Sequence, residues 1–288
     1  MGLNSVVLVK QVPDTQNISG QAMKPDGTVN RDALPAIFNP EDLNALEMAL
    51  EVREKTGGTV TAVTMGPPKA EEVLRECLYR GADDAVLVSD RAFAGADTLA
   101  TSYALKCTIE RLGPCDLVFC GRQAIDGDTA QVGPQVAEKL GFNQLTGVCA
   151  LLDIDQSRIT VRRSIENGTE VLRAHLPLVV TTTSDANVPR SPSAKLVMAY
   201  KKLACMDDDA YDETYIESEC SMAVSHIRKW NVDSIKADLE RCGLSGSATK
   251  VKKIENVVLA AREMKQVENT EPEIRNLIKS LIDEHILG

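Results

Sequence analysis

The sequence predicts a doubly wound α/β fold on a mainly parallel sheet, followed by an antiparallel extension and a helical C-terminal arm. Three observations lead to this prediction: short continuous apolar runs, helical patterns between them, and closely spaced strand signals after Leu145. Continuous apolar runs are typical of parallel strands that are covered on both faces. Their alternation with helices indicates a doubly wound sheet.

The parallel core is predicted from four apolar or β-branched runs, at residues 6–9, 59–65, 85–88 and 117–120. The first helix has the clearest start, because Asn39 suits the N-cap and Pro40 suits the first helical position. Apolar residues at helical spacing continue this helix through residues 43–50. Two further helices are predicted to begin near Pro68 and at Asp97.

The antiparallel extension is predicted from strand signals at residues 148–154, 159–163, 171–174 and 178–183. Between the second and the third signal, Asn167-Gly168 favours a hairpin turn. We therefore expect these strands to follow one another at one side of the parallel core.

After Thr183 the pattern becomes less regular. Residues 184–193 predict a polar loop, and residues 207–219 hold seven acidic residues and no basic one, which is typical of a solvated linker. Helical patterns follow at residues 232–241, 257–266 and 273–286. Their apolar faces are modest, so we expect an arm that packs on a partner.

Composition excludes several classes of function. The chain has 288 residues, a net charge of −10 and only 3% aromatic residues, which argues against binding to nucleic acid. No apolar run approaches the roughly 20 residues of a membrane helix, and no secretory signal is visible, so we expect a cytoplasmic protein without membrane insertion. None of the eight cysteines forms a Cys-x-x-Cys pair, which predicts reduced thiols and no metal site. Such thiol-rich usage would suit an anaerobe.

The most informative segment is the loop at residues 121–134, which follows the strand at 117–120 and precedes an amphipathic run. Ligands of open α/β sheets bind beyond the carboxyl ends of such strands. Gly121, Gly127 and Gly133 predict positive φ angles or close backbone approach. Asp128 or Thr129 is expected to cap the next helix, whose first amides would then hold a phosphate. The alternative is an ordinary polar connection, but those usually have only about 2–6 residues.

Three other segments are expected beside this loop: residues 10–15, residues 64–67 and Asn39-Pro40-Glu41. Together they predict a nucleotide site of the Rossmann-like kind. The chain lacks both the Gly-x-Gly-x-x-Gly fingerprint and a Walker loop, so neither an ordinary dinucleotide dehydrogenase nor a P-loop NTPase fits.

We find no catalytic constellation in the sequence. There is no Gly-x-Ser-x-Gly elbow, and His175, His226 and His285 lie far apart along the chain. A protein that binds a nucleotide cofactor without acid–base residues leaves the chemistry to the cofactor.

These motifs resemble the β subunit of electron-transfer flavoprotein over most of the chain. The resemblance rests on Val9-Lys10-Gln11-Val12-Pro13-Asp14, Asn39-Pro40-Glu41-Asp42, Met65-Gly66-Pro67, Gly81-Ala82-Asp83, Gly95-Ala96-Asp97-Thr98, the 121–134 loop and residues 243–251. It implies a heterodimer with an α subunit that holds one flavin. In simple members the β subunit holds AMP, whereas in flavin-bifurcating members it holds a second FAD whose ADP half takes the AMP position.

Two segments resemble the bifurcating group more than the AMP-binding group: Val12-Pro13-Asp14-Thr15 and Gly127-Asp128-Thr129-Ala130-Gln131. The resemblance then implies that FAD accepts hydride from NADH. One electron passes through the α-subunit FAD to a dehydrogenase, and the other reduces ferredoxin or flavodoxin. A simple electron carrier with structural AMP is the alternative. A nucleotide-sensing or adenylate-transferring module is a remote one, because no Ser-Gly-Gly-x-Asp-Ser loop follows the first strand.

The loop argument and the resemblance together assign a set of cofactor-binding residues. They are Leu8, Lys10, Gln11, Val12, Pro13, Asp14, Asn39, Glu41, Met65, Gly66, Gly121, Arg122, Gln123, Ala124, Asp128, Thr129, Ala130, Gln131, Val132, Gly133 and Pro134.

The resemblance also assigns partner recognition to Ala194, Lys195, Leu196 and Met198. Family members commonly present a leucine here to an acyl-CoA dehydrogenase, but this chain has Ala194 near that position. A flavin-dependent lactate or 2-hydroxyacid dehydrogenase is therefore an alternative partner. We expect three regions: a nucleotide- or flavin-binding domain at 1–186, a partner-recognition loop at 187–206, and an arm at 207–288 that packs on the α subunit.

Overall fold

The computed structural model describes residues 2–14, 35–207, 224–249 and 266–283. Within them a ten-stranded sheet has the order β11-β12-β5-β4-β1-β6-β10-β7-β8-β9. Its strands are β1 (Ser5–Leu8), β4 (Val60–Met65), β5 (Asp84–Val88), β6 (Leu117–Gly121), β7 (Asn143–Ile154), β8 (Arg158–Ile165), β9 (Gly168–His175), β10 (Leu178–Thr182), β11 (Cys205–Asp207) and β12 (Ile227–Trp230). A small antiparallel pair joins β2 (Gln11–Pro13) to β3 (Ala36–Phe38).

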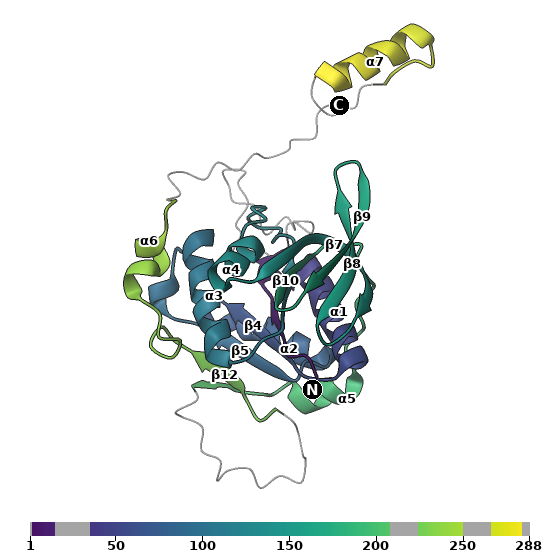
Figure 1. The fold of residues 1–288 in the computed structure, drawn as a ribbon. Coiled ribbons are helices and arrows are strands. Elements are labelled where there is room, and N and C mark those ends of the chain that lie inside the picture. The colour runs from purple at the N-terminus through teal and green to yellow at the C-terminus, as the bar shows by residue number, and fades with distance from the viewer. Residues whose placement is uncertain (1, 15–34, 208–223, 250–265, 284–288) are drawn as a thin grey trace.

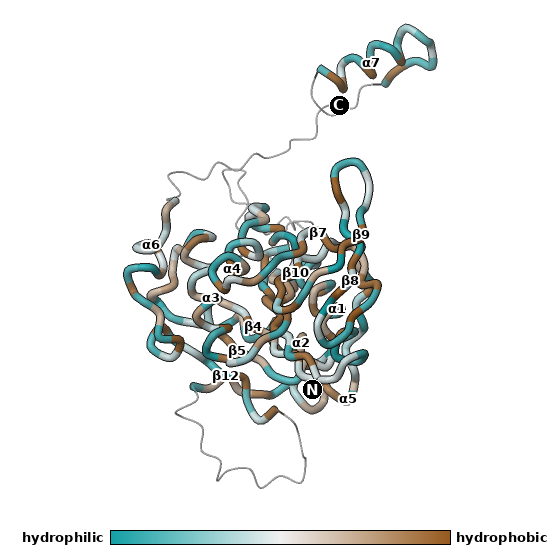
Figure 2. The backbone as a smooth tube through the Cα atoms, viewed as in Figure 1, coloured by the Kyte–Doolittle hydropathy of each residue, from teal (hydrophilic) through white to brown (hydrophobic). Residues whose placement is uncertain are grey.

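Helices cover both faces of the parallel core (Figure 1). α1 (Pro40–Thr56) and α2 (Glu71–Arg80) pack on one face, and α3 (Thr98–Leu112) and α4 (Val132–Leu140) on the other. The remaining helices are α5 (Ala194–Tyr200), α6 (Gly243–Gly246) and α7 (Glu271–Asp283), with short 3-10 turns at Pro68–Ala70, Arg91–Phe93 and Leu239–Arg241. α7 lies apart from the sheet (Figure 1). The strand side chains alternate between two apolar cores: Val7 packs with α1 and α2, whereas Val6 and Leu8 pack with α3 and α4. Figure 2 shows the hydrophobic segments gathered among these central strands.

The predicted doubly wound sheet is confirmed. β1 pairs in parallel with β4 on one side and with β6 on the other, so Leu8 lies between Val63 and Cys120. β4 and β5 lie on one side of β1, whereas β6 and β10 lie on its other side. The connections therefore diverge between β1 and β6, and the carboxyl ends of such strands are where doubly wound sheets bind their ligands.

The antiparallel extension is confirmed for β7, β8 and β9, which pair antiparallel in sequence. The turn between β8 and β9 is Glu166-Asn167, because Ile165 pairs with Gly168. β10 differs from the expectation, since it is inserted between β6 and β7 and runs parallel to both.

The C-terminal part of the chain differs more from the sequence prediction than the antiparallel extension does. The helix predicted at residues 232–241 is wrong: this segment contains only the 3-10 turn at Leu239–Arg241, and Val232 and Ile235 enter the core beside Trp230. β11 and β12 extend the parallel sheet beyond β5 and were missed. α7 corresponds to the helix predicted at 273–286, whereas the linker at 207–219 and the helix at 257–266 lie almost wholly outside the described residues.

None of the helices in the described ranges is long and apolar enough to cross a membrane.

The segment between β10 and α5 is fixed on the side of α1 by polar contacts. Asn44 Nδ2 donates to the Asn187 carbonyl oxygen at 2.9 Å, and Asn187 Nδ2 donates to the Asn44 carbonyl oxygen at 3.0 Å. Arg190 donates through Nε and Nη2 to the carboxylate of Glu47 at 2.8–3.1 Å, and Nη1 donates to Glu54 at 2.6 Å. Glu47 is only 7% exposed, so this is a largely desolvated ion pair.

We predict that Arg190→Ala lowers the free energy of unfolding by about 2 kcal/mol, because the buried Glu47 carboxylate loses its positively charged partner and keeps only the N–H of residue 190. Urea denaturation measures the change. The control is Arg275→Ala, which removes a pair with Glu271 whose side chains are 78% and 84% exposed, and which should cost less than about 0.5 kcal/mol. Equal effects of the two changes would contradict this interpretation.

Candidate functional site

Asp42, in the first turn of α1, lies at the carboxyl ends of β1 and β6. Asp42 Oδ2 accepts the Lys10 N–H at 2.9 Å, and Oδ1 accepts the Gly121 N–H at 2.9 Å. The side chain is buried, and burial raises its pKa to about 7 against the opposing effect of these hydrogen bonds. Asp42 therefore links the two strands where they end.

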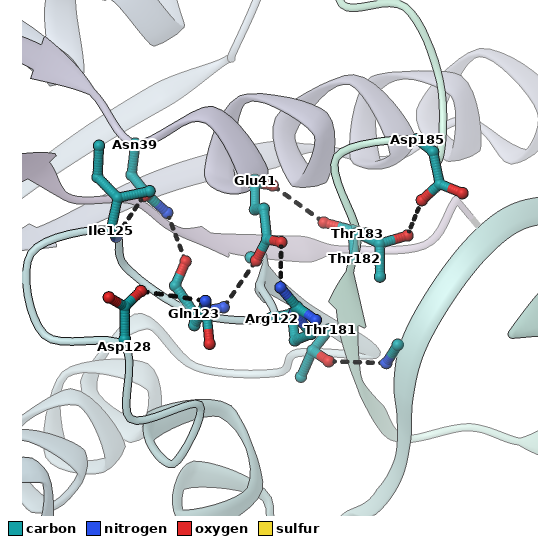
Figure 3. Close-up of polar contacts among 12 residues, drawn as sticks. Asn39, Glu41, Arg122, Gln123, Ile125, Asp128, Thr181, Thr182, Thr183 and Asp185 are labelled. Atoms are coloured by element: carbon teal, nitrogen blue, oxygen red, sulfur yellow. Dashed lines mark hydrogen bonds and ion pairs between the residues drawn. The ribbon is translucent and has the colours of Figure 1, made fainter. Parts of the chain in front are cut away.

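Glu41 binds the start of the loop that follows β6. Its Oε2 accepts the Gln123 N–H at 2.8 Å, and its Oε1 lies 3.2 Å from Arg122 Nη2. The Thr182 hydroxyl at the end of β10 donates to the Glu41 carbonyl oxygen at 3.0 Å (Figure 3). The first turn of α1 thus holds the ends of three neighbouring strands.

Asn39 occupies the predicted N-cap position, but its side chain makes no capping hydrogen bond to α1. Instead, Nδ2 donates to the Gln123 carbonyl oxygen at 2.9 Å and Oδ1 accepts the Ile125 N–H at 3.2 Å (Figure 3). The amide side chain satisfies one donor and one acceptor of an irregular loop, which explains its burial.

The helix after the loop begins later than the sequence predicts. α4 starts at Val132 with Gln131 at the N-cap position and no side-chain cap, so capping by Asp128 or Thr129 is wrong. Asp128 has a φ of 49° and Ala130 a φ of 52°. A left-handed backbone is unfavourable for alanine and is found mainly where surrounding structure or function requires it.

The loop leaves backbone donors available beside this strained stretch. Residues 127–131 are exposed, and Asp128 Oδ1 accepts a hydrogen bond from Gln123 Nε2 at 3.1 Å rather than from the helix. The first amides of an α-helix have no intrahelical acceptor and suit an anion. The start of α4 together with the left-handed residues is therefore a chemically suitable place for a phosphate.

None of the three loop glycines has a φ in the left-handed region, so the predicted positive φ angles are wrong, whereas the predicted close approach is found at Gly121 and Gly133. A Cβ on Gly121 would lie 2.5 Å from Asp42 Oδ1, and one on Gly133 would lie 2.7 Å from Thr181 Cγ2. A Cβ on Gly127 would meet nothing within 4 Å.

The segment after β1 reaches the same loop. Lys10 Nζ donates to both carboxylate oxygens of Asp126 at 2.8 Å. Gln11 Nε2 donates to Glu72 at 3.1 Å, while Leu8 and Val12 are buried in the packing. The Gly66 N–H donates to the Val88 carbonyl oxygen at 3.0 Å, so the turn after β4 continues the same edge of the sheet.

A hollow of about 360 Å³ lies beside the loop on the side of β7 and β8. Its lining consists of Arg122, Ala130, Pro134, Thr146, Gly147, Arg163, Ser164, Ile165 and Thr181. The sequence did not indicate the contribution of β7 and β8, because their place at this edge depends on the insertion of β10. Gly147 has a φ of 67°, and its N–H donates to Thr181 Oγ1 at 3.1 Å, which fixes β7 there.

The predicted partner-binding residues all lie at the start or within α5. Ala194, Lys195 and Met198 are exposed, Met198 at 67%, whereas Leu196 packs against the core. Val188, in the preceding loop, is 91% exposed and was missed as an exposed apolar residue.

Comparison with known proteins identifies relatives over nearly the whole chain. Residues 26–206 match the family described as the electron transfer flavoprotein domain. The chain is 40% identical to the electron transfer flavoprotein subunit beta of Thermoanaerobacterium thermosaccharolyticum over 99% of this chain and 100% of that protein. It is 43% identical to the subunit of the same name from Clostridium acetobutylicum over 87% of each chain. It is 42% identical to the caffeyl-CoA reductase-Etf complex subunit CarD of Acetobacterium woodii over 85% of each chain.

We predict that Gly121→Ala lowers the free energy of unfolding by about 1–3 kcal/mol, because the added methyl group displaces Asp42. Gly127→Ala, in the same loop but with open space around the new atom, should change it by less than about 0.5 kcal/mol. Chemical denaturation of both variants tests the prediction, and similar stability of the two would refute it.

Proposed function

The chain belongs to the electron transfer flavoprotein family, in the group of its β subunits, and we propose that its 121–134 loop binds the adenine nucleotide of a flavin cofactor. The observation that carries this proposal is the backbone of the loop, with left-handed Asp128 and Ala130 directly before the first amides of α4. This arrangement offers several N–H donors to a phosphate.

Other parts of the same edge support a nucleotide rather than a free phosphate. The ends of β1 and β4 and the first turn of α1 lie together near the point where strand connections diverge. The cofactor-binding residues assigned from the sequence come from these elements. Residues 10–14, Asn39 and Glu41, and Met65 and Gly66 would frame the nucleoside, while residues 121–134 would hold its phosphates.

We favour FAD over AMP because the hollow beside the loop could receive more than a nucleotide. It is lined by Arg122 and Arg163, whose guanidinium groups suit the phosphates or the electron-rich edge of a flavin. The similarity to a subunit of a caffeyl-CoA reductase-Etf complex supports a role in a multi-subunit reductase. AMP in a simple electron carrier is the alternative.

FAD bound here would supply hydride acceptance from NADH and the separation of its electrons toward ferredoxin and toward the FAD of an α subunit. The chain's own residues would bind and orient this cofactor. A lactate or 2-hydroxyacid dehydrogenase, or an acyl-CoA dehydrogenase, would receive the electron that passes through the FAD of the α subunit. We assign its contact to α5, where Met198 and Lys195 are exposed.

The cofactor content of the chain co-purified with its α subunit tests the proposal. We expect two FAD per heterodimer, and ferredoxin reduction by NADH that requires the oxidised substrate of the partner dehydrogenase. One FAD and one AMP would identify a simple electron carrier instead. Absence of any adenine nucleotide from this chain would overturn the site assignment itself.

We predict that the double change Asp128→Ala with Thr129→Ala weakens nucleotide binding by about tenfold or more, because it removes a polar pair from the exposed loop and changes a left-handed residue. Nucleotide per protein after dialysis measures the loss. Asp153→Ala, at a side chain 68% exposed in β7, serves as the control and should retain the full amount. Unchanged nucleotide content in the double variant would exclude this loop as the phosphate site.

A further inference from the structure

Asp42 is a buried link between the ends of β1 and β6. The residue is 6% exposed, and its two oxygens accept the N–H groups of Gly121 and Lys10, each at 2.9 Å. An ionised carboxylate only accepts hydrogen bonds, whereas a protonated one carries an O–H donor on one of its oxygens. A proton on either oxygen removes the negative charge that strengthens both hydrogen bonds and takes one lone pair of that oxygen, so the contacts with the two N–H groups are weakened.

Both of these N–H groups belong to residues that position the loop of the candidate site. Gly121 is its first residue, and the side chain of Lys10 pairs with Asp126 in its middle at 2.8 Å. Asp42 therefore holds the loop at its start through Gly121, and it fixes the backbone of the lysine that holds Asp126.

The groups that face Asp42 come from every element packed around it. They are Lys10 after β1 and the thiols of Cys120 in β6 and Cys77 in α2. The charged groups next to these are already paired, Glu41 with Arg122 and Asp126 with Lys10. Burial raises the pKa of both thiols, so they remain neutral near pH 7. Burial likewise raises the pKa of Asp42 to about 7, while hydrogen bonds from Gly121, Asn39 and Lys10 oppose the shift.

We propose that Asp42 is a positioning residue whose protonation loosens residues 121–131 of the loop and lowers the affinity of the loop for its nucleotide. The inference rests on the proposed function, because it takes this loop to be the nucleotide site. Asparagine imitates the protonated carboxyl: its oxygen accepts one N–H, and its NH₂ group faces the other.

Protonation of Asp42 weakens the loop contacts, but it increases the free energy of unfolding of the whole protein. The folded-state pKa of Asp42 lies above its ordinary value of 3.8, so the buried neutral form is favoured. The corresponding stabilisation is fully present below the ordinary pKa and is lost as the pH rises through about 7. Asp42→Asn should thus raise the Tm relative to wild type as pH increases, while it weakens nucleotide binding.

The test measures AMP binding to the full chain by calorimetry from about pH 5.5 to about pH 8.5. We expect wild type to bind AMP about tenfold more tightly than the Asp42→Asn variant at the upper end, and equally at the lower end. Titration of the AMP phosphate is common to both proteins and cancels in this ratio. The control is Asp116→Asn. Asp116 accepts the Asn4 N–H at 2.8 Å at the opposite ends of β1 and β6, so this variant should bind like wild type at every pH.

A ratio that does not vary with pH, or equal affinities throughout, would overturn the inference. Loss of affinity together with a lower Tm at all pH values would also overturn it, because that indicates general destabilisation. Failure of wild type to bind any adenine nucleotide would instead overturn the proposed function, and this inference with it.

Hydrogen exchange of wild-type protein tests the same step without a variant. After correction for the intrinsic pH dependence of exchange, protection of the Gly121 amide should fall several-fold between about pH 8 and about pH 6. Constant protection would contradict a role for Asp42 protonation.

Discussion

The candidate site depends on one arrangement, in which two carboxylates at the start of α1 accept backbone N–H groups from the ends of β1 and β6. Asp42 joins Lys10 to Gly121, and Glu41 accepts from Gln123. Negative charge is favourable at a helix N-terminus, so the helix dipole helps to hold both side chains there. Because the contacts are short and largely buried, Gly121 has no space for a side chain.

This arrangement accounts for the absence of the usual dinucleotide fingerprint. In a Rossmann fold the glycine-rich turn after the first strand brings a pyrophosphate to the N-terminus of the first helix. Here the protein's own Glu41 and Asp42 occupy the corresponding position, and a β2–β3 pair separates β1 from α1. An anion is therefore better accommodated at the next helix along this edge, α4, whose first turn has no side-chain cap.

Much of the fold followed from the sequence because buried parallel strands are continuous apolar runs and α1 has clear start signals. β11 and β12 could not be predicted from the sequence, since they are three and four residues long and carry charged residues such as Arg228 and Lys229. The site was predicted as a set of strand ends, which topology alone brings together. Its detailed geometry was not predictable: the Asp42 and Asn39 contacts join residues roughly 80 positions apart, and no local pattern indicates which amides a carboxylate will accept.

Helix α1 also connects this edge of the sheet with the surface around α5. Its first turn holds the ends of β1, β6 and β10, and further along Asn44 and Glu47 hold Asn187 and Arg190. The segment that leaves β10 at Thr182 thus stays on α1 until it approaches the exposed residues of α5. Since a helix is stiff over a few turns, the positions of Glu41, Asn44 and Glu47 along α1 fix how far residues 187 and 190 lie from the loop. The loop at one end of α1 and the segment that leads to α5 are thus held by side chains of one rigid helix.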